Sequence, residues 1–330
     1  MAAEVRKGQL TADFGKAAVD YGKHRAGFPA ELFERLAAMG IVQSGRRAVD
    51  LGTGTGTIAR SLAQRGCESI GLDRSAPLME EARRLDREVG VTVRYVEAAA
   101  EDTGFPEASF DLVIAGQCWF WFDRRRAANE ARRIVKPSGH LVIAHFDWIP
   151  LPGNIADVTE KLIEKHNPKW KLGGSVGIHP RCLGDMALAG FRRLETFSFD
   201  LDVPYSHEAW RGRIRASAGV GASLSPEGVA AFDRELQALL REEFPQELLA
   251  VLHRVFAAIG KAPEVNPDPL LWGGSFTPES SRAQPQSVPS IFSCRLRLQL
   301  SQRGVHRFKS AGVSKVSRSQ HAIDSLPQER

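Results

Sequence analysis

Between Arg46 and Asp147 the chain alternates short apolar runs with longer amphipathic stretches. Runs rich in β-branched residues predict strands, and stretches with apolar residues every three or four positions predict helices. The expected strands are Arg47–Leu51, Ser69–Asp73, Val91–Glu97, Phe110–Ala115 and His140–Phe146. The expected helices are Thr57–Gly66, Ala76–Val89 and Arg124–Val135, with a turn after them at Lys136-Pro137-Ser138-Gly139. Strands that alternate with helices predict a doubly wound, mostly parallel α/β sheet.

Further elements flank this region on both sides. The expected helices are Thr11–Asp20, Pro29–Met39, Ile155–His166, Arg181–Ala189, His207–Ser217 and Pro226–Phe244, and the expected strands are Phe191–Tyr205 and Val251–Ile259. These strands bring the sheet to seven, with a helical cap at about 207–245 inserted before the last strand. We therefore expect N-terminal helices over 1–45, a cofactor-binding domain over 46–263 and a tail over 264–330.

Charge is distributed unevenly along the 330 residues. The net charge is +5, of which residues 264–330 carry +4, from nine Lys and Arg against five Asp and Glu. This segment also holds 12 Ser and 6 Pro, without a sustained helical or strand period, so we predict a disordered basic tail. The remaining residues carry +1 and lack the basic surplus that nucleic-acid binding favours.

The cysteines and the apolar stretches exclude several classes of protein. Cys67, Cys118, Cys182 and Cys294 are far apart and form no Cys-x-x-Cys motif, so we predict reduced thiols and no metal site. The first ten residues contain no apolar signal segment. The longest apolar stretch, 248–260, is interrupted by a histidine and an arginine. We therefore expect a cytoplasmic protein without a membrane partner; the sequence does not indicate its oligomeric state.

A glycine-rich turn is the most informative motif. It reads Asp50-Leu51-Gly52-Thr53-Gly54-Thr55-Gly56-Thr57 and joins a strand to a helix. Because Thr57 stands where the dinucleotide fingerprint has glycine, and no Gly-Lys-Ser/Thr follows, the turn matches neither a dinucleotide nor a phosphate loop. Asp73 ends the next strand, 21 positions after Gly52, where an acid is placed to accept hydrogen bonds from ribose hydroxyls.

Over residues 12–263 or so, the chain resembles the class I S-adenosylmethionine-dependent methyltransferases, whose first motif is acid-x-Gly-x-Gly-x-Gly. The resemblance implies S-adenosylmethionine as the cofactor, with its methionine part on the loop, its ribose on Asp73 and its adenine beside Glu101. The implied cofactor site consists of Tyr21, Arg25, Asp50, Gly52, Thr53, Gly54, Asp73, Arg74, Ala100, Glu101 and Gln117.

Two further segments narrow the resemblance. Residues 21–29, Tyr-Gly-Lys-His-Arg-Ala-Gly-Phe-Pro, and residues 117–123, Gln-Cys-Trp-Phe-Trp-Phe-Asp, resemble the trans-aconitate methyltransferase-like branch. This chain has Ala26, Phe120 and Ser138 where that branch has proline, histidine and glycine. The resemblance implies that the N-terminal segment covers the cofactor, with Tyr21 and Arg25 closing over its carboxylate.

The acceptor is predicted to be a small molecule, with a carboxylate as one candidate. A carboxylate needs only cations to hold it, whereas an amine or hydroxyl benefits from a base. Arg211 and Arg215 share a face at helical spacing while Arg213 points elsewhere, so we predict Arg211 and Arg215 as acceptor ligands. The predicted base is His145 or Asp147, at the carboxyl end of the fifth strand, and the predicted lining is Trp119 and Trp121.

Each acceptor residue also has a structural interpretation: salt bridges within a helix face for the arginines, and packing for the histidine and the tryptophans. Two other functions are open, a methyltransferase acting on nucleic acid or protein, and a non-catalytic regulatory protein that binds the cofactor. The charge balance favours a small molecule over nucleic acid. So does the segment Gly116-Gln117-Cys118-Trp119, which stands where an Asn/Asp-Pro-Pro-Tyr motif would be expected.

Overall fold

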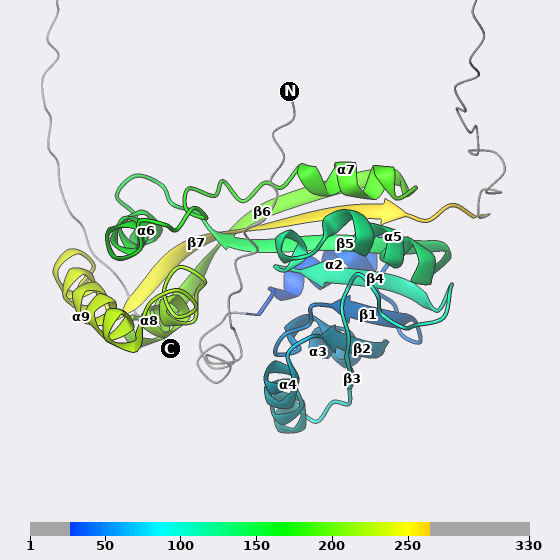
Figure 1. Ribbon diagram of the computed structural model, residues 1–330, viewed down its shortest axis with the longest axis horizontal. Helices are drawn as coiled ribbons and strands as arrows, with labels where there is room; N and C mark the ends of the chain where they lie inside the picture. The colour runs from blue at the N-terminus through cyan, green and yellow to red at the C-terminus, as the bar shows by residue number, and fades with distance from the viewer. Residues whose placement is uncertain (1–26, 265–330) are drawn as a thin grey trace, which may run out of the picture. The chain divides into compact units, whose positions relative to one another are not determined.

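The computed structural model describes residues 27–264 and contains a seven-stranded sheet in this range (Figure 1). The strands are β1 (Arg47–Leu51), β2 (Glu68–Asp73), β3 (Arg94–Glu97), β4 (Phe110–Gly116), β5 (Val135–Trp148), β6 (Arg192–Ser206) and β7 (Leu248–Lys261). Their order is β3-β2-β1-β4-β5-β7-β6. The first five strands along the chain pair in parallel, and β7 is antiparallel to both β5 and β6. The predicted doubly wound, mostly parallel sheet is confirmed.

Some predicted features lie outside the described residues. These are the helix at Thr11–Asp20, the cofactor residues Tyr21 and Arg25, the cysteine at position 294, and the tail beyond Glu264.

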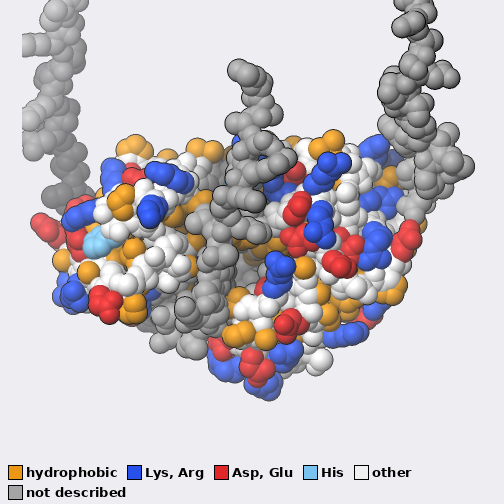
Figure 2. Space-filling view, in the orientation of Figure 1, with side chains coloured by type: hydrophobic (Ala, Val, Ile, Leu, Met, Phe, Trp, Pro, Cys, Tyr) orange, Lys and Arg blue, Asp and Glu red, His pale blue; other side chains and the backbone are white. Residues whose placement is uncertain are grey.

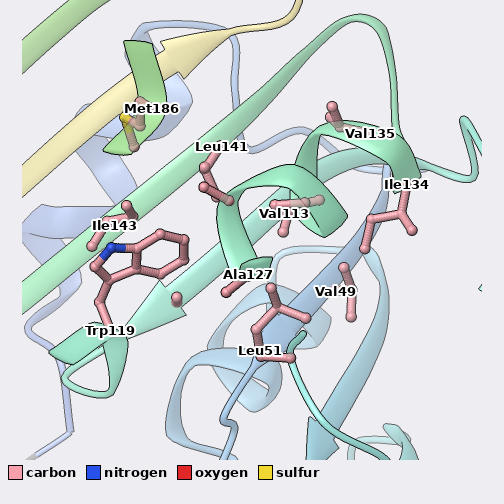
Figure 3. Packing of buried hydrophobic residues seen from close by; sticks show 14 of the residues in the cluster. Val49, Leu51, Val113, Trp119, Ala127, Ile134, Val135, Leu141, Ile143 and Met186 are labelled. Atoms are coloured by element: carbon pink, nitrogen blue, oxygen red, sulfur yellow. The ribbon is translucent and has the colours of Figure 1, made fainter. Parts of the chain in front are cut away.

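Helices cover both faces of the sheet. They are α2 (Ala30–Ala38), α3 (Thr57–Gln64), α4 (Ala76–Val89), α5 (Arg124–Ile134), α6 (Ile155–His166), α7 (Arg181–Leu188), α8 (His207–Arg215) and α9 (Pro226–Glu243), with a 3-10 turn, η2 (Trp119–Trp121). One apolar cluster packs α2 and α3 against the sheet, and a second packs α5 and α7 against it (Figure 3). No helix within 27–264 is long and apolar enough to cross a membrane.

Strand length divides the sheet into two halves. Strands β1 to β4 have four to seven residues, whereas β5, β6 and β7 have 14, 15 and 14. At about 3.3 Å per residue, β6 is roughly 50 Å long. At one end of β6 and β7 lie α6, α8 and α9 (Figure 1), which form a third apolar cluster around Trp210, 0% exposed. Helices α8 and α9 form the predicted cap before the last strand.

The expected turn at Lys136-Pro137-Ser138-Gly139 is instead a bulge within β5. Val135 pairs with Phe110 and His140 pairs with Leu112, so the residues between them protrude from the ladder. Ser138 adopts a left-handed φ of 63°, and its amide donates to the carbonyl of Pro263. Proline and glycine therefore mark the bulge rather than the start of the strand, and α5 ends at Ile134.

Candidate active site

The glycine-rich loop joins β1 to α3, and two of its glycines are required by the chain's own packing. Gly52 has a φ of 67°, and a Cβ there would lie 2.9 Å from both the Cys118 Sγ and the Phe122 ring. Gly56 is the left-handed N-cap of α3, with a φ of 77°. The glycine pattern is therefore explained in part by the fold alone, and the evidence for a ligand has to come from the surrounding groups.

Asp50 lies beneath this loop, with only 2% of its surface exposed. Its Oδ2 accepts hydrogen bonds from the Thr53 hydroxyl at 2.7 Å and from the Ala59 amide at 3.3 Å. Burial raises the pKa of Asp50 to about 7. Asp50 and Thr53, both predicted cofactor ligands, thus hold the loop in shape through their side chains.

Asp73 lies at the carboxyl end of β2, beside the loop, where the sequence predicts a ribose-binding acid. Its Oδ2 accepts from the Gly54 amide at 2.8 Å, and its Oδ1 accepts from the Ser75 amide at 2.9 Å. Burial raises the pKa of Asp73, while these amides oppose the shift. The carboxylate remains partly exposed. Since each carboxylate oxygen has a second lone pair, Asp73 can still accept hydrogen bonds from a ligand.

The other predicted cofactor residues differ in their surroundings. Arg74 is exposed and Ala100 is buried in the core. Glu101 accepts a hydrogen bond from the Asp123 amide at 2.8 Å. Gln117 follows β4 with a left-handed φ of 60°, and its side chain bonds both the Phe146 amide and the Asp147 carboxylate. Gln117 therefore fixes the edge of β5.

A small pocket, called the cavity below, lies against the loop. Its lining comes from both halves of the sheet and from the cap, and consists of Phe28, Gly52, Thr53, Gly54, Thr55, Thr57, Gly116, Phe146, Tyr205, Arg213 and His253. Arg213 and His253 were not predicted site residues. No sequence signal marked His253, and helical spacing set Arg213 apart from the other two arginines without showing what it faces.

Arg211 and Arg215 do share a helix face, as predicted, but that face packs against α9. Arg211 forms a bidentate ion pair with Asp233, and Arg215 reaches the same carboxylate at 2.7 Å. Glu208 binds both arginines as well. These ion pairs neutralise both charges within the cap. The structure thus gives Arg211 and Arg215 a role in packing α8 against α9, which differs from the predicted binding of the acceptor.

Trp119 lies in the core rather than in the cavity. It is 1% exposed, and its indole lies within the apolar cluster near Ile143 (Figure 3). The indole N–H donates to Asp185 at 2.9 Å. Trp121 is half-buried and packs against the same cluster. The aromatic spacing after β4 thus reflects packing of the 3-10 turn.

His145 and Asp147, the predicted base candidates, meet a third residue that sequence reasoning missed. The His179 ring donates from Nε2 to the Asp147 carboxylate at 2.6 Å and stacks on His145, with 3.7 Å between ring centroids. Burial lowers the pKa of His145 to about 4. His145 is 2% exposed, whereas the His179 side chain is 27% exposed. Of the two histidines, His179 is the one that solvent or a ligand can reach.

These three side chains also offer ligand atoms that all lie within 4.8 Å of one another, close enough to share a metal ion. The sequence prediction of no metal site rested on spacing along the chain, which misses residues that the fold brings together. The His179–Asp147 hydrogen bond and the stacking of His179 on His145 explain why these three side chains lie close together.

Comparisons with known proteins agree with this geometry. Residues 49–143 match the model of a methyltransferase domain. The chain is 31% identical over 132 residues to an uncharacterised methyltransferase of Mycobacterium tuberculosis, covering 40% of this chain and 51% of that protein. It thus spans about half the length of that relative. It is 30% identical over 230 residues to the malonyl-[acyl-carrier protein] O-methyltransferase of Enterobacter lignolyticus, covering 68% of this chain and 84% of that protein.

One solved structure shows the same fold. It is a protein of Anaeromyxobacter dehalogenans assigned to the type II methyltransferases, with a TM-score of 0.52 and 23% identity, covering 73% of this chain and 98% of that one. The donor set suits S-adenosylmethionine, since Gly52, Thr53 and Gly54 line the cavity and the Asp73 carboxylate, bonded to the Gly54 amide, can accept further hydrogen bonds. The chain belongs to the class I S-adenosylmethionine-dependent methyltransferases.

Proposed function

We propose that this chain transfers a methyl group from S-adenosylmethionine to a small-molecule acceptor, with a carboxylate as the first candidate. The observation that carries the proposal is the hydrogen bond between Asp73 and the Gly54 amide, which fixes an acid beside the glycine loop. An acid and a loop at adjacent strand ends form the position at which open α/β sheets bind nucleotide-like ligands.

The loop backbone of Gly52, Thr53 and Gly54 would hold the methionine part of the cofactor, and Asp73 would accept hydrogen bonds from its ribose. When bound, S-adenosylmethionine supplies a methyl group on a positively charged sulfur. The roles of Tyr21 and Arg25, which lie outside the described residues, stay predictions. The trans-aconitate-like branch stays a prediction as well: of its two segments, 117–123 is described in full and 21–29 only from residue 27.

The chain's main contribution to the reaction is orientation of two bound molecules. The cavity places lining residues of the cap, of β5 and of β7 opposite the loop, so that an acceptor entering it would lie against the cofactor. His179, held by Asp147, is the more exposed of the two stacked histidines but does not line the cavity, so we assign no base for a hydroxyl or amine acceptor. A carboxylate acceptor would need no base.

Two observations bear on the acceptor. The relative from Enterobacter lignolyticus is named as an O-methyltransferase of malonyl-[acyl-carrier protein], which supports an oxygen atom as the acceptor. On the face shown in Figure 2, acidic and basic side chains are interspersed over the described surface, without the continuous basic stripe that nucleic acid favours. A cytoplasmic location stays a prediction, consistent with the free, buried Cys67 and Cys182.

Calorimetric titration with S-adenosylmethionine tests the proposal. Asp73→Ala removes charged hydrogen bonds that contribute about 1.5–3 kcal/mol, so we expect the dissociation constant to rise roughly 10- to 150-fold. Asp111→Ala is the matched control, because Asp111 is near the opposite end of β4 and bonds Lys136 and the Arg47 amide. Lack of binding to the wild type, or equal affinity for both variants and the wild type, would contradict the proposed function.

A further inference from the structure

Arg213 occupies a different environment from the other arginines of α8. It lines the cavity opposite the glycine loop, and its guanidinium carbon lies 4.8 Å from the centroid of the Trp148 ring. Stacking on an aromatic face holds a guanidinium in place and leaves its N–H edge available for hydrogen bonds. The side chain is therefore positioned, and it is partly buried.

Within residues 27–264, Arg213 has no carboxylate within salt-bridge distance, in contrast to Arg211 and Arg215. Over a longer range, two ionisable groups interact with it: the Tyr205 hydroxyl first, and then Asp147, whose oxygens are already bonded to Gln117 and His179. Burial lowers the pKa of Arg213, as it does for a cation that has lost water without gaining an acid.

The groups next to Arg213 in the cavity add no second charge near pH 7. His253 contacts the Val251 carbonyl through Nδ1 at 2.8 Å, and burial lowers its pKa to about 4, so it is neutral near pH 7. Phe28 and Phe146 supply apolar walls, and Trp148 packs against the Arg213 guanidinium. The cavity thus combines apolar surface with one cation, which suits a ligand that carries one planar anion.

We propose that Arg213 binds a carboxylate of the methyl acceptor, in the cavity between the cap and the glycine loop. The inference rests on the proposed function and names the class of acceptor. A guanidinium fork matches the two oxygens of a carboxylate. We assign this carboxylate to the acceptor rather than to the methionine part of the cofactor. Trp148 and His253, which surround Arg213, belong to β5 and β7, whereas Asp73 and the loop belong to the β1–β4 half.

Thermal unfolding of the full chain, saturated with S-adenosylhomocysteine, tests this assignment. The probes are hexanoate and benzoate, each compared with its neutral amide, and inorganic phosphate. We expect the carboxylates to raise the melting temperature of the wild type and the amides to have no effect. Arg213→Met should lose the carboxylate response, and Arg211→Met, in the same helix, should retain it. The ligand-free Arg213→Met protein should melt no lower than the wild type, because methionine can fill the site over Trp148 without a charge.

Several results would overturn the assignment. These are an equal carboxylate response in Arg213→Met and the wild type, no carboxylate response in the wild type, or a larger response to phosphate than to carboxylates. A tenfold loss of S-adenosylhomocysteine affinity in Arg213→Met with an unchanged carboxylate response would assign Arg213 to the cofactor instead. Failure of the wild type to bind S-adenosylhomocysteine would contradict the proposed function alone, since the carboxylate response can also be measured without it.

Discussion

The two halves of the sheet position their functional groups by different means. In the half formed by β3, β2, β1 and β4, short strands end in loops, and backbone amides fix the key acid: Gly54 and Ser75 both donate to Asp73. In the half formed by β5, β7 and β6, strands of 14 or 15 residues extend to a cap. There, side-chain ion pairs and aromatic stacking set the geometry, as for Arg213 on Trp148.

This difference implies that the halves have different tolerances to mutation. Backbone geometry constrains the cofactor loop, so a single added methyl group can disturb it. The cap is instead stabilised by charged side chains around Asp233. Replacing one of these side chains should change the stability of the cap and leave the loop unaffected. Three predictions test this comparison, beginning with the largest expected effect.

The largest effect is expected for Gly56→Ala in the loop. A Cβ at position 56 would lie 2.3 Å from the Tyr95 hydroxyl, which is itself bonded to Asp86, and the φ of 77° disfavours alanine. We expect a loss of about 3 kcal/mol or more in the free energy of unfolding, measured by urea denaturation, together with weaker binding of S-adenosylmethionine.

Gly90→Ala is the control for this variant. Gly90 ends α4 with a φ of 68°, but a Cβ there would have no atom within 4 Å. Alanine at position 90 would have the strained backbone conformation but no steric overlap, so the expected loss in the free energy of unfolding is about 1 kcal/mol. Equal losses in the two variants would show that backbone strain alone constrains the loop and that Tyr95 does not.

Sequence patterns predicted the half formed by β3, β2, β1 and β4 well, because its elements follow one another along the chain. The strands, the glycine turn and Asp73 are adjacent elements of one repeating strand–helix unit, so spacing along the chain fixes their relation in space. The exception is the bulge at 136–139, where Val135 already pairs with Phe110. Proline and glycine mark an irregularity in the backbone, but they do not show whether pairing resumes on both sides of it.

The half formed by β5, β7 and β6 was predicted poorly because the residues around the cavity and around Asp147 come from distant parts of the chain. Helical spacing correctly separated Arg213 from Arg211 and Arg215, yet only the packing of α8 on α9 shows that the pair faces Asp233 and the single arginine faces the cavity. His179 reaches Asp147 from 32 residues away, which spacing does not indicate.

The second prediction concerns Asp233→Asn in the cap. This change removes the acid that Arg211 and Arg215 share, where the exposed fractions of the Arg211 and Asp233 side chains are 12% and 17%. We expect a loss of about 2 kcal/mol in the free energy of unfolding. Affinity for S-adenosylmethionine should be unchanged.

Glu235→Gln is the matched control on the same helix. Glu235 also binds two basic groups, Lys165 and His166, but its side chain is 39% exposed, so the expected loss is below about 1 kcal/mol. If Asp233→Asn weakened cofactor binding tenfold, the halves would be coupled and the comparison drawn above would be wrong.

The smallest effect is expected from His253→Gln, and it depends on pH. In the unfolded chain histidine titrates near pH 6.5, whereas burial lowers the pKa of His253 to about 4 in the folded protein. Between these values the unfolded chain binds more protons, so the free energy of unfolding falls as the pH falls below 6.5, by up to about 1.4 kcal/mol per pH unit. Glutamine does not titrate. The free energy of unfolding should therefore fall less for His253→Gln than for the wild type when the pH is lowered from 7.5 to 5.5, by about 1 kcal/mol. Urea denaturation at each pH measures this difference.

His145→Gln provides the comparison across the sheet, because burial lowers the pKa of His145 to about 4 as well, away from the cavity. The two variants should flatten the pH profile by similar amounts. Only His253→Gln should alter the carboxylate response, since His253 lines the cavity with Arg213. If both variants followed the wild-type profile in parallel, the pKa of each histidine would be the same in the folded and unfolded chain, and the cavity would gain a second cation beside Arg213 only below about pH 6.5.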